Sequence, residues 1–121
     1  MVIDMSLFEE LKELGVDVDG GLKRINGNEK LYTKLLGTFT KSINTYSVAP
    51  DFDAANCEEV IEKTHAIKGV SGNLSMTPLY EAYTKIVDLL RAGKPEEARP
   101  ILEQILPVQE KIVACIEKYS E

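Results

Sequence analysis

The segment 57–74, CEEVIEKTHAIKGVSGNL, decides the fold. Its apolar and small residues recur at an alternating spacing of three and four positions, at Cys57, Val60, Thr64, Ile67, Ser71 and Leu74. This spacing is typical of the buried seam of a helix that packs lengthwise in a bundle. We therefore predict a helix that begins within 53–56, ends at about Asn73 and buries this stripe.

Two short helices are predicted before this segment. Ser6 and Glu9 resemble a capping box that opens a helix through Leu14. Asp19 is expected to cap a second, brief helix that ends at Gly27. Helical periodicity of this kind extends over the chain, and no segment alternates like a strand with one exposed face.

Two long helices flank the central one. Asn28 is expected to cap the first, and a loop follows at Pro50, because the residue before a proline avoids the α region. Thr77 and Pro78 predict a restart, with threonine as the cap and proline at the first helical position, and Gly93 ends that helix. The predicted stripes consist of Leu31, Tyr32, Leu35, Leu36, Phe39, Ile43 and Tyr46, and of Leu79, Ala82, Ile86, Leu89 and Leu90.

The last helix begins at 94–97 and contains two prolines. Pro100 lies close enough to the start to be tolerated, whereas Pro107 predicts a kink, since it removes a backbone donor. Four long helices joined by short loops predict an all-α, antiparallel up-down-up-down four-helix bundle in one domain over 1–121. The short N-terminal helices should cover one end. The last stripe comprises Ile101, Leu102, Ile105, Ile112, Val113 and Ile116.

Composition restricts the function classes. The chain is 44% apolar and 28% charged, which is ordinary for a soluble globular domain. Its net charge of −6 argues against nucleic acid as a partner. The N-terminus shows neither a signal peptide nor a membrane span, so we expect a cytoplasmic protein without membrane insertion. Cys57 and Cys115 match no metal-ligand spacing and are expected to be buried, reduced thiols.

His65 is the single histidine of the chain. At about 100° per residue it lies roughly 120° from the centre of the buried stripe, so it should face solvent. Lys68, Gly69 and Gly72 follow at three, four and seven positions, which share the face of His65. Glycine inside a helix costs about 1 kcal/mol relative to alanine. Two glycines on one exposed stripe therefore favour close approach of another surface to the imidazole.

This combination suits transient binding of a phosphoryl group. A neutral imidazole has a nucleophilic ring nitrogen, and Lys68 places a cation within reach of the group that His65 would hold. Each residue also has an ordinary interpretation. A lone surface histidine is usually only solvated, Lys68 is compatible with helix-surface charge, and Gly69 or Gly72 with helix packing or a helix end. The combination, more than any single residue, favours the functional interpretation.

The sequence HAIKGVSGNL at 65–74 resembles the motif of histidine-containing phosphotransfer (HPt) domains. That motif consists of His, any residue, Leu or Ile, Lys, Gly, a small residue, Ser or Ala, two variable positions and an apolar residue. Ser75 stands where the family usually has glycine, and Val70 is bulkier than usual. The resemblance covers about 16–119 and includes Gly21, Leu22, Arg24, Gly27, Asn28, Tyr32, Leu35, Leu36 and Phe39.

The resemblance implies a carrier in a multistep two-component phosphorelay. His65 would accept phosphate from a receiver-domain aspartyl phosphate and pass it to another receiver, with Lys68 beside the phosphate. The receiver would dock around Ile61, Glu62, Gly69 and Gly72. Such a carrier has no kinase activity of its own, and no ATP-binding motif is present. It needs no cofactor, since Mg²⁺ belongs to the receiver.

Partners and alternatives complete these expectations. The implied partners are response-regulator receiver domains and a hybrid sensor histidine kinase, and we expect a monomer. A helical adaptor that binds a partner without accepting phosphate is the alternative. A metal-binding four-helix bundle should carry Glu-x-x-His pairs on facing helices. The single histidine of this chain makes that third interpretation poor, so no metal site is predicted.

Overall fold

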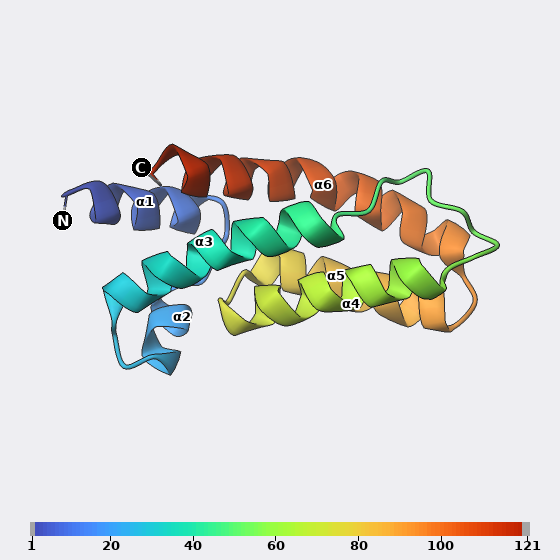
Figure 1. The fold of residues 1–121 in the computed structure, drawn as a ribbon, viewed down its shortest axis with the longest axis horizontal. Coiled ribbons are helices and arrows are strands. Elements are labelled where there is room, and N and C mark those ends of the chain that lie inside the picture. Colours follow the sequence, from blue (N-terminus) through green and yellow to red (C-terminus); the bar gives the residue numbers. More distant parts are fainter. Residues whose placement is uncertain (1, 120–121) are drawn as a thin grey trace.

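The computed structural model describes residues 2–119, and their side chains from residue 7 onward, as an all-α structure (Figure 1). This part of the chain contains six helices and no strand, which confirms the predicted class. None of these helices is both long and apolar enough to cross a membrane. In chain order they are α1 (Val2–Glu13), α2 (Val18–Arg24), α3 (Glu29–Tyr46), α4 (Glu58–Asn73), α5 (Thr77–Arg91) and α6 (Pro95–Lys118).

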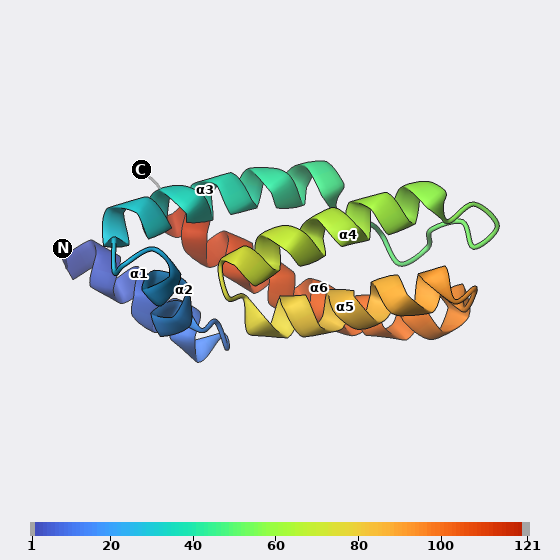
Figure 2. The same ribbon diagram turned by 90° about the horizontal axis from the view of Figure 1, so that it is seen from below.

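The four long helices lie lengthwise beside one another and alternate in direction (Figures 1 and 2). Helix α4 packs between α3 and α5, and α6 packs against both α5 and α3. Helix α1 packs on α6, and α2 packs on α1 and α3, at the end of the molecule where α4 also ends. The end of α4 is therefore surrounded by the N-terminal segment.

Helices α1 and α2 begin at other residues than predicted, whereas the predicted cap of α3 is confirmed. Helix α1 begins at Val2, so the predicted capping residue Ser6 lies inside the helix. Helix α2 is capped by Asp17, whose carboxylate accepts from the Gly20 N–H, and the prediction of Asp19 as the cap was wrong. Asn28 caps α3 as predicted, since its side-chain oxygen accepts from the Leu31 N–H at 3.0 Å.

Helix α4 begins later than predicted. The Asp53 carboxylate accepts from the Ala55 N–H at 2.9 Å, and the Asp53 carbonyl accepts from the Asn56 N–H. These bonds form a turn of the kind that aspartate favours over a helix start. Helix α4 therefore starts at Glu58, with Cys57 as its cap residue. The thiol of Cys57 is only half-buried, contrary to prediction, whereas Cys115 is buried, and both are free.

Helix α6 begins within the predicted range, and the cap position of α5 lies one residue before the predicted one. Thr77 is the first residue of α5, and Met76 takes the cap position in its place. Helix α6 runs without interruption through Pro100 and Pro107, so Pro107 does not split it. The bend predicted at Pro107 stays a prediction.

The predicted seam of α4 is confirmed, since Val60, Thr64, Ile67 and Ser71 are buried. Two stripe predictions for α3 were wrong: Leu31 and Tyr46 lie in its first and last turns and are 38% and 39% exposed. Sequence reasoning missed the buried polar pair of α5 and α6, in which the Tyr83 hydroxyl donates to the Gln109 side-chain oxygen. Burial of the phenol raises the pKa of Tyr83. Further buried residues outside the predicted stripes are Val87 and Ala98.

Helix α1 is attached to α6 by apolar and charged contacts. Leu7 and Leu11 are buried, and the Lys118 ammonium donates to the Glu10 carboxylate at 2.8 Å. The hydrogen bond from Lys118 lowers the pKa of Glu10. Desolvation by burial raises the pKa of the neighbouring Cys115 thiol to about 11, so it stays protonated.

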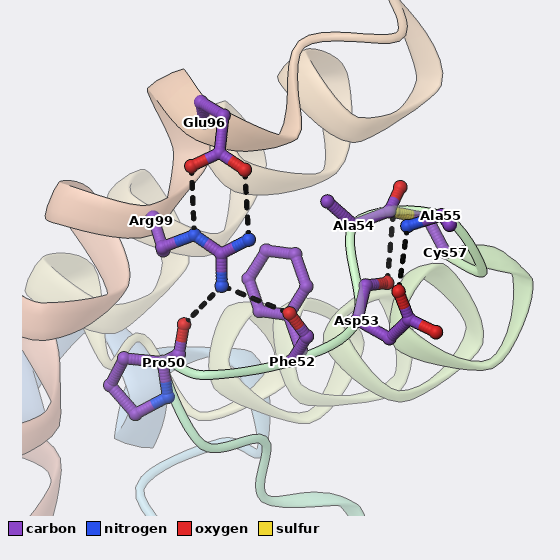
Figure 3. A network of polar contacts seen from close by, with 8 residues as sticks. All are labelled: Pro50, Phe52, Asp53, Ala54, Ala55, Cys57, Glu96 and Arg99. Carbon is purple, nitrogen blue, oxygen red and sulfur yellow. Dashed lines mark hydrogen bonds and ion pairs between the residues drawn. The ribbon is translucent and has the colours of Figure 1, made fainter.

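Arg99 of α6 fixes the loop between α3 and α4 (Figure 3). Its guanidinium donates twice to the Glu96 carboxylate, at 3.0 and 2.9 Å. A third nitrogen donates to the carbonyls of Pro50 and Phe52, at 2.6 and 2.9 Å. The guanidinium carbon also lies 4.3 Å from the centre of the Phe52 ring. The loop is therefore held to α6 by a guanidinium whose N–H donors nearly all have acceptors.

Candidate functional site

His65 lies in the middle of α4, between the buried residues Thr64 and Ile67, and its side chain is exposed as predicted. Because α4 buries the opposite stripe against α3 and α5, the helix presents the imidazole outward. His65 lines a cavity of about 610 Å³. Lys68 and Gly69 line the same cavity, so the structure brings these three predicted site residues together.

Gly69 and Gly72 both line the cavity but for different physical reasons. A Cβ added at Gly69 would meet no described residue within 4 Å, so the packing of the described residues does not require glycine at this exposed position. A Cβ at Gly72 would lie 2.9 Å from the Tyr80 ring, which covers that glycine from α5. The open approach predicted for both positions therefore holds at Gly69, whereas Gly72 makes room for the chain's own tyrosine.

The first turn of α5 supplies another wall of the cavity, through Thr77, Tyr80 and Glu81. The cap residue of this helix, Met76, makes no side-chain hydrogen bond to the end of α5. Tyr80 is 42% exposed although it is aromatic, and its ring bridges the gap between α5 and Gly72. These α5 residues were not predicted for the site. The spacing of residues within α4 does not show which residues of α5 pack beside His65.

Arg24 of α2 contributes a second cation, which was not predicted for this site. Its guanidinium donates to the Gly72 carbonyl at 2.6 Å and lines the cavity with Lys68. Asp17 and Glu81 also line it, so two cations face two carboxylates within a chain of net charge −6. The lining of this cavity therefore carries no net charge, whereas the whole chain carries −6.

The turn after α4 is fixed by donors from the N-terminal segment. The Tyr32 hydroxyl donates to the Leu74 carbonyl at 2.8 Å, and the Asp17 N–H donates to the Ser75 carbonyl at 2.9 Å. Burial, together with the nearby charge of Asp17, raises the pKa of Tyr32 to about 12, so this hydroxyl keeps its proton. With the bond from Arg24 to Gly72, three carbonyls of this turn bind residues 17–32.

Ser75 adopts a left-handed conformation, with φ of +57°. Glycine populates this region at little cost, whereas other L-residues are strained there. Residue 75 therefore has a backbone geometry that glycine adopts more readily than serine. The serine reaches that geometry within the hydrogen bonds of the turn.

Ile61 and Glu62 lie one turn before His65 and do not line its cavity. Ile61 is half-buried against the core, and Glu62 is exposed. A second, more apolar groove of about 420 Å³ lies beyond Arg24 and Asn73, which line both cavities. Its apolar lining includes Ile25 and Leu35, and Leu35 belongs to the predicted stripe of α3.

This arrangement can hold a phosphoryl group on an imidazole. The ring nitrogen supplies a nucleophile, Lys68 supplies charge beside it, and Gly69 leaves space for a donor. Over the part of the chain that the structure describes, no three His, Cys, Asp or Glu side chains gather as metal ligands. In comparisons with protein-family models, curated proteins and solved structures, no match to this chain was found.

Proposed function

We propose that this chain is a histidine phosphotransfer carrier of a two-component phosphorelay. His65 accepts a phosphoryl group from the aspartyl phosphate of one receiver domain and passes it to another. The observation that carries this proposal is the exposed single histidine in a cavity with Lys68 and the unobstructed Gly69. The resemblance of 65–74 to the HPt motif supports the same function.

The phosphoryl transfer needs no reactant other than this chain and the receiver domain. Nε2 of His65 attacks phosphorus in line, the N–P bond forms, and the P–O bond to the receiver's aspartate breaks, which releases the carboxylate. Phosphoryl transfer through a loose transition state depends mainly on positioning and charge neutralisation. Lys68 neutralises part of the charge, whereas Mg²⁺ and the other acidic groups belong to the receiver. The chain itself then needs neither a cofactor nor kinase activity.

The proposed scaffold is an antiparallel four-helix bundle of α3, α4, α5 and α6 in a single cytoplasmic domain. The alternating helix directions and the packing of α6 against α3, which closes the ring of four, support this description. A monomer suits the role, since the receiver must reach His65. A rigid helix places the imidazole more exactly than a loop would.

The receiver is proposed to dock over Gly69 and over the Tyr80 ring that covers Gly72, with Ile61 and Glu62 at one edge. The apolar groove beyond Arg24 adds contact area on the other side. A transient signalling contact of this kind buries little surface, about 1,200 Å² or less in total. Response-regulator receiver domains are the partners that this chemistry requires, and a hybrid sensor kinase that contains such a domain is one form in which a receiver is supplied.

Replacement of His65 tests the proposal. The chain and its His65→Gln variant are each incubated with phosphorylated receiver domains from the same genome, and label transfer is followed over time. Wild type should gain an acid-labile, base-stable phosphate, and the variant none, because glutamine keeps size and polarity without a nucleophilic ring nitrogen. Lys111→Gln, on the exposed surface of α6, is the control and should accept label normally. Equal labelling of His65→Gln and wild type would exclude His65 as the acceptor.

A helical adaptor function without phosphate is the alternative. It predicts that receiver binding, measured by chemical-shift changes, persists in both proteins while neither becomes labelled.

A further inference from the structure

Arg24 has hydrogen-bonding capacity that the fold does not use. A guanidinium has five N–H donors, and among the described residues Arg24 donates only to the Gly72 carbonyl. Its side chain is exposed, and within the described residues neither Arg24 nor Lys68 forms an ion pair. Two cations without carboxylate partners therefore line the cavity of His65.

Two carboxylates line the same cavity but differ in freedom. The Asp17 carboxylate is engaged as the cap of α2, where it accepts from the Gly20 N–H at 3.0 Å. Glu81 is exposed on α5 and forms no ion pair with any described residue. Both carboxylates repel an incoming anion, and Glu81 is the one that caps no helix, so its replacement removes a charge without removing a cap.

We propose that Arg24 and Lys68 form an anion-attracting pair that captures phosphate-type dianions on their way to His65, opposed by Glu81. This inference rests on the proposed phosphorylation of His65 for its purpose. The two cations have different roles. Lys68 lies one helical turn from His65, beside the reacting group. Arg24 is held at Gly72, two turns along α4, and acts on the approach of the donor rather than on the reacting phosphorus.

Separation and screening set the size of the effect. Seven residues of helix rise correspond to about 10 Å between His65 and Gly72. This is close to the Debye length of about 10 Å at 0.1 M salt. Arg24 should therefore act strongly at low ionic strength and weakly at high ionic strength. Charged groups that line a cleft raise association rates by about 10-fold to 1,000-fold when they act together, so a single cation accounts for the lower end.

Phosphoramidate is a small anionic donor that tests the pair without a receiver. Nε2 of His65 attacks its phosphorus, the N–P bond to imidazole forms, and the P–N bond of the donor breaks as ammonia leaves with a proton. Initial rates are compared for wild type, Arg24→Gln, Glu81→Gln and Lys23→Gln at low and high salt. Lys23 is the matched control, since it precedes Arg24 in α2, is exposed and lines neither cavity.

The decisive result is that the two substitutions change the rate of phosphorylation in opposite directions. At low salt Arg24→Gln should slow phosphorylation by about 3-fold to 10-fold and Glu81→Gln should accelerate it by about 2-fold, while Lys23→Gln stays near wild type. All differences should shrink in 0.5 M salt, by about half or more. Arg24→Lys keeps the charge and should recover most of the rate. If Arg24 had a purely structural role at the end of α4, Arg24→Gln would lower the thermal stability but would not change the salt dependence of the phosphorylation rate. Glu81→Gln would then be phosphorylated at the wild-type rate.

Titration with inorganic phosphate separates this inference from the proposed function. Chemical-shift changes should appear at His65, Lys68 and Gly69 and weaken in Arg24→Gln but not in Lys23→Gln. If wild type binds phosphate in this manner but never becomes phosphorylated, the carrier function fails and the anion site stands. If Arg24→Gln and Glu81→Gln match Lys23→Gln in both experiments, the anion site is refuted, whatever the fate of His65.

Discussion

Two arginines bind backbone carbonyls of a distant segment, and they differ in how many of their donors the fold uses. Arg24 is the last residue of α2 and Arg99 lies near the start of α6, at opposite ends of the molecule (Figure 1). Arg99 binds Glu96 twice, donates to Pro50 and Phe52 and stacks over the Phe52 ring (Figure 3). Arg24 is exposed and, of the residues that the structure describes, binds Gly72 alone. The difference separates an arginine that closes a loop from one whose remaining donors face a cavity.

The surroundings of Arg99 are also more covered than those of Arg24. Around Arg99 the α3–α4 loop is covered by α6, and Phe52 is half-buried beneath the guanidinium. Around Arg24 the surface is open, because the nearby Gly69 has nothing within 4 Å of its missing Cβ. At the end of the molecule that contains Arg99, the closed end, the cation is bound by the chain itself. At the end that contains Arg24, the open end, hydrogen-bond donors of the cation and the space around Gly69 remain accessible.

The largest effect is expected from filling the open end. Gly69→Arg adds a long side chain at a position without neighbours, so α4 keeps its packing. Receiver-to-His65 transfer should fall at least about tenfold, a barrier increase of about 1.4 kcal/mol. The melting temperature should stay unchanged or rise, because arginine is the better helix former by about 1 kcal/mol.

Gly37→Arg is the matched control for Gly69→Arg. Gly37 is also a helical glycine with nothing within 4 Å, in α3, and it lines neither cavity. Phosphoramidate, which is far smaller than a receiver, should still label Gly69→Arg. Slow transfer together with a clearly lower melting temperature would mean that Gly69 is a packing residue.

An intermediate effect is expected from opening the closed end. Arg99→Gln removes the charged donor of two loop carbonyls and the cation above Phe52. Hydrogen bonds to charged groups contribute more than neutral ones, so the melting temperature should fall by about 5 °C. Labelling of His65 should be unchanged, since the loop lies at the other end of α4. Arg24→Gln should lower the melting temperature less, because it loses a single bond.

Arg91→Gln is the control for Arg99→Gln, because Arg91 is an exposed arginine in the last turn of α5. It should leave the melting temperature nearly unchanged. An equal loss of stability in Arg24→Gln and Arg99→Gln would remove the contrast and make Arg24 a structural residue.

The sequence predicted the helices better than the cavity. The seam of α4 and the outward direction of His65 follow from periodicity within one helix, and the structure confirms both. Arg24 and Tyr80 were missed because their places depend on how α2 and α5 pack against the end of α4. Gly72 shows the same limit, since its spacing from His65 resembles an open stripe while Tyr80 covers it.

The errors at helix starts have a local cause. Aspartate, serine and asparagine all accept from nearby backbone donors, and the sequence alone does not rank the competing donors. Asp17 caps α2 where Asp19 was predicted, and Asp53 forms a turn where a helix start was predicted. Buried polar pairs such as Tyr83 and Gln109 were missed for another reason. Their hydrophilic members break the apolar stripe from which core positions are predicted.

The smallest effect is expected at Ser75, in the turn that joins the open end to the N-terminal segment. Its φ of +57° is strained for serine and relaxed for glycine. Left-handed conformation costs an L-residue about 1 to 2 kcal/mol, and the greater freedom of glycine in the unfolded chain offsets about 0.4 to 1 kcal/mol. Ser75→Gly should therefore raise the free energy of unfolding by about 0.5 to 1 kcal/mol, measured by urea denaturation. Asn26→Gly is the control, because Asn26 has a similar φ of +58° but asparagine tolerates this region, so its gain should be smaller. Because the backbone bond from Asp17 to the Ser75 carbonyl is retained in the variant, Arg24 should keep its place and His65 its rate of labelling. A loss of stability in Ser75→Gly would show that the serine side chain, and not the backbone of the turn, holds the N-terminal segment against α4.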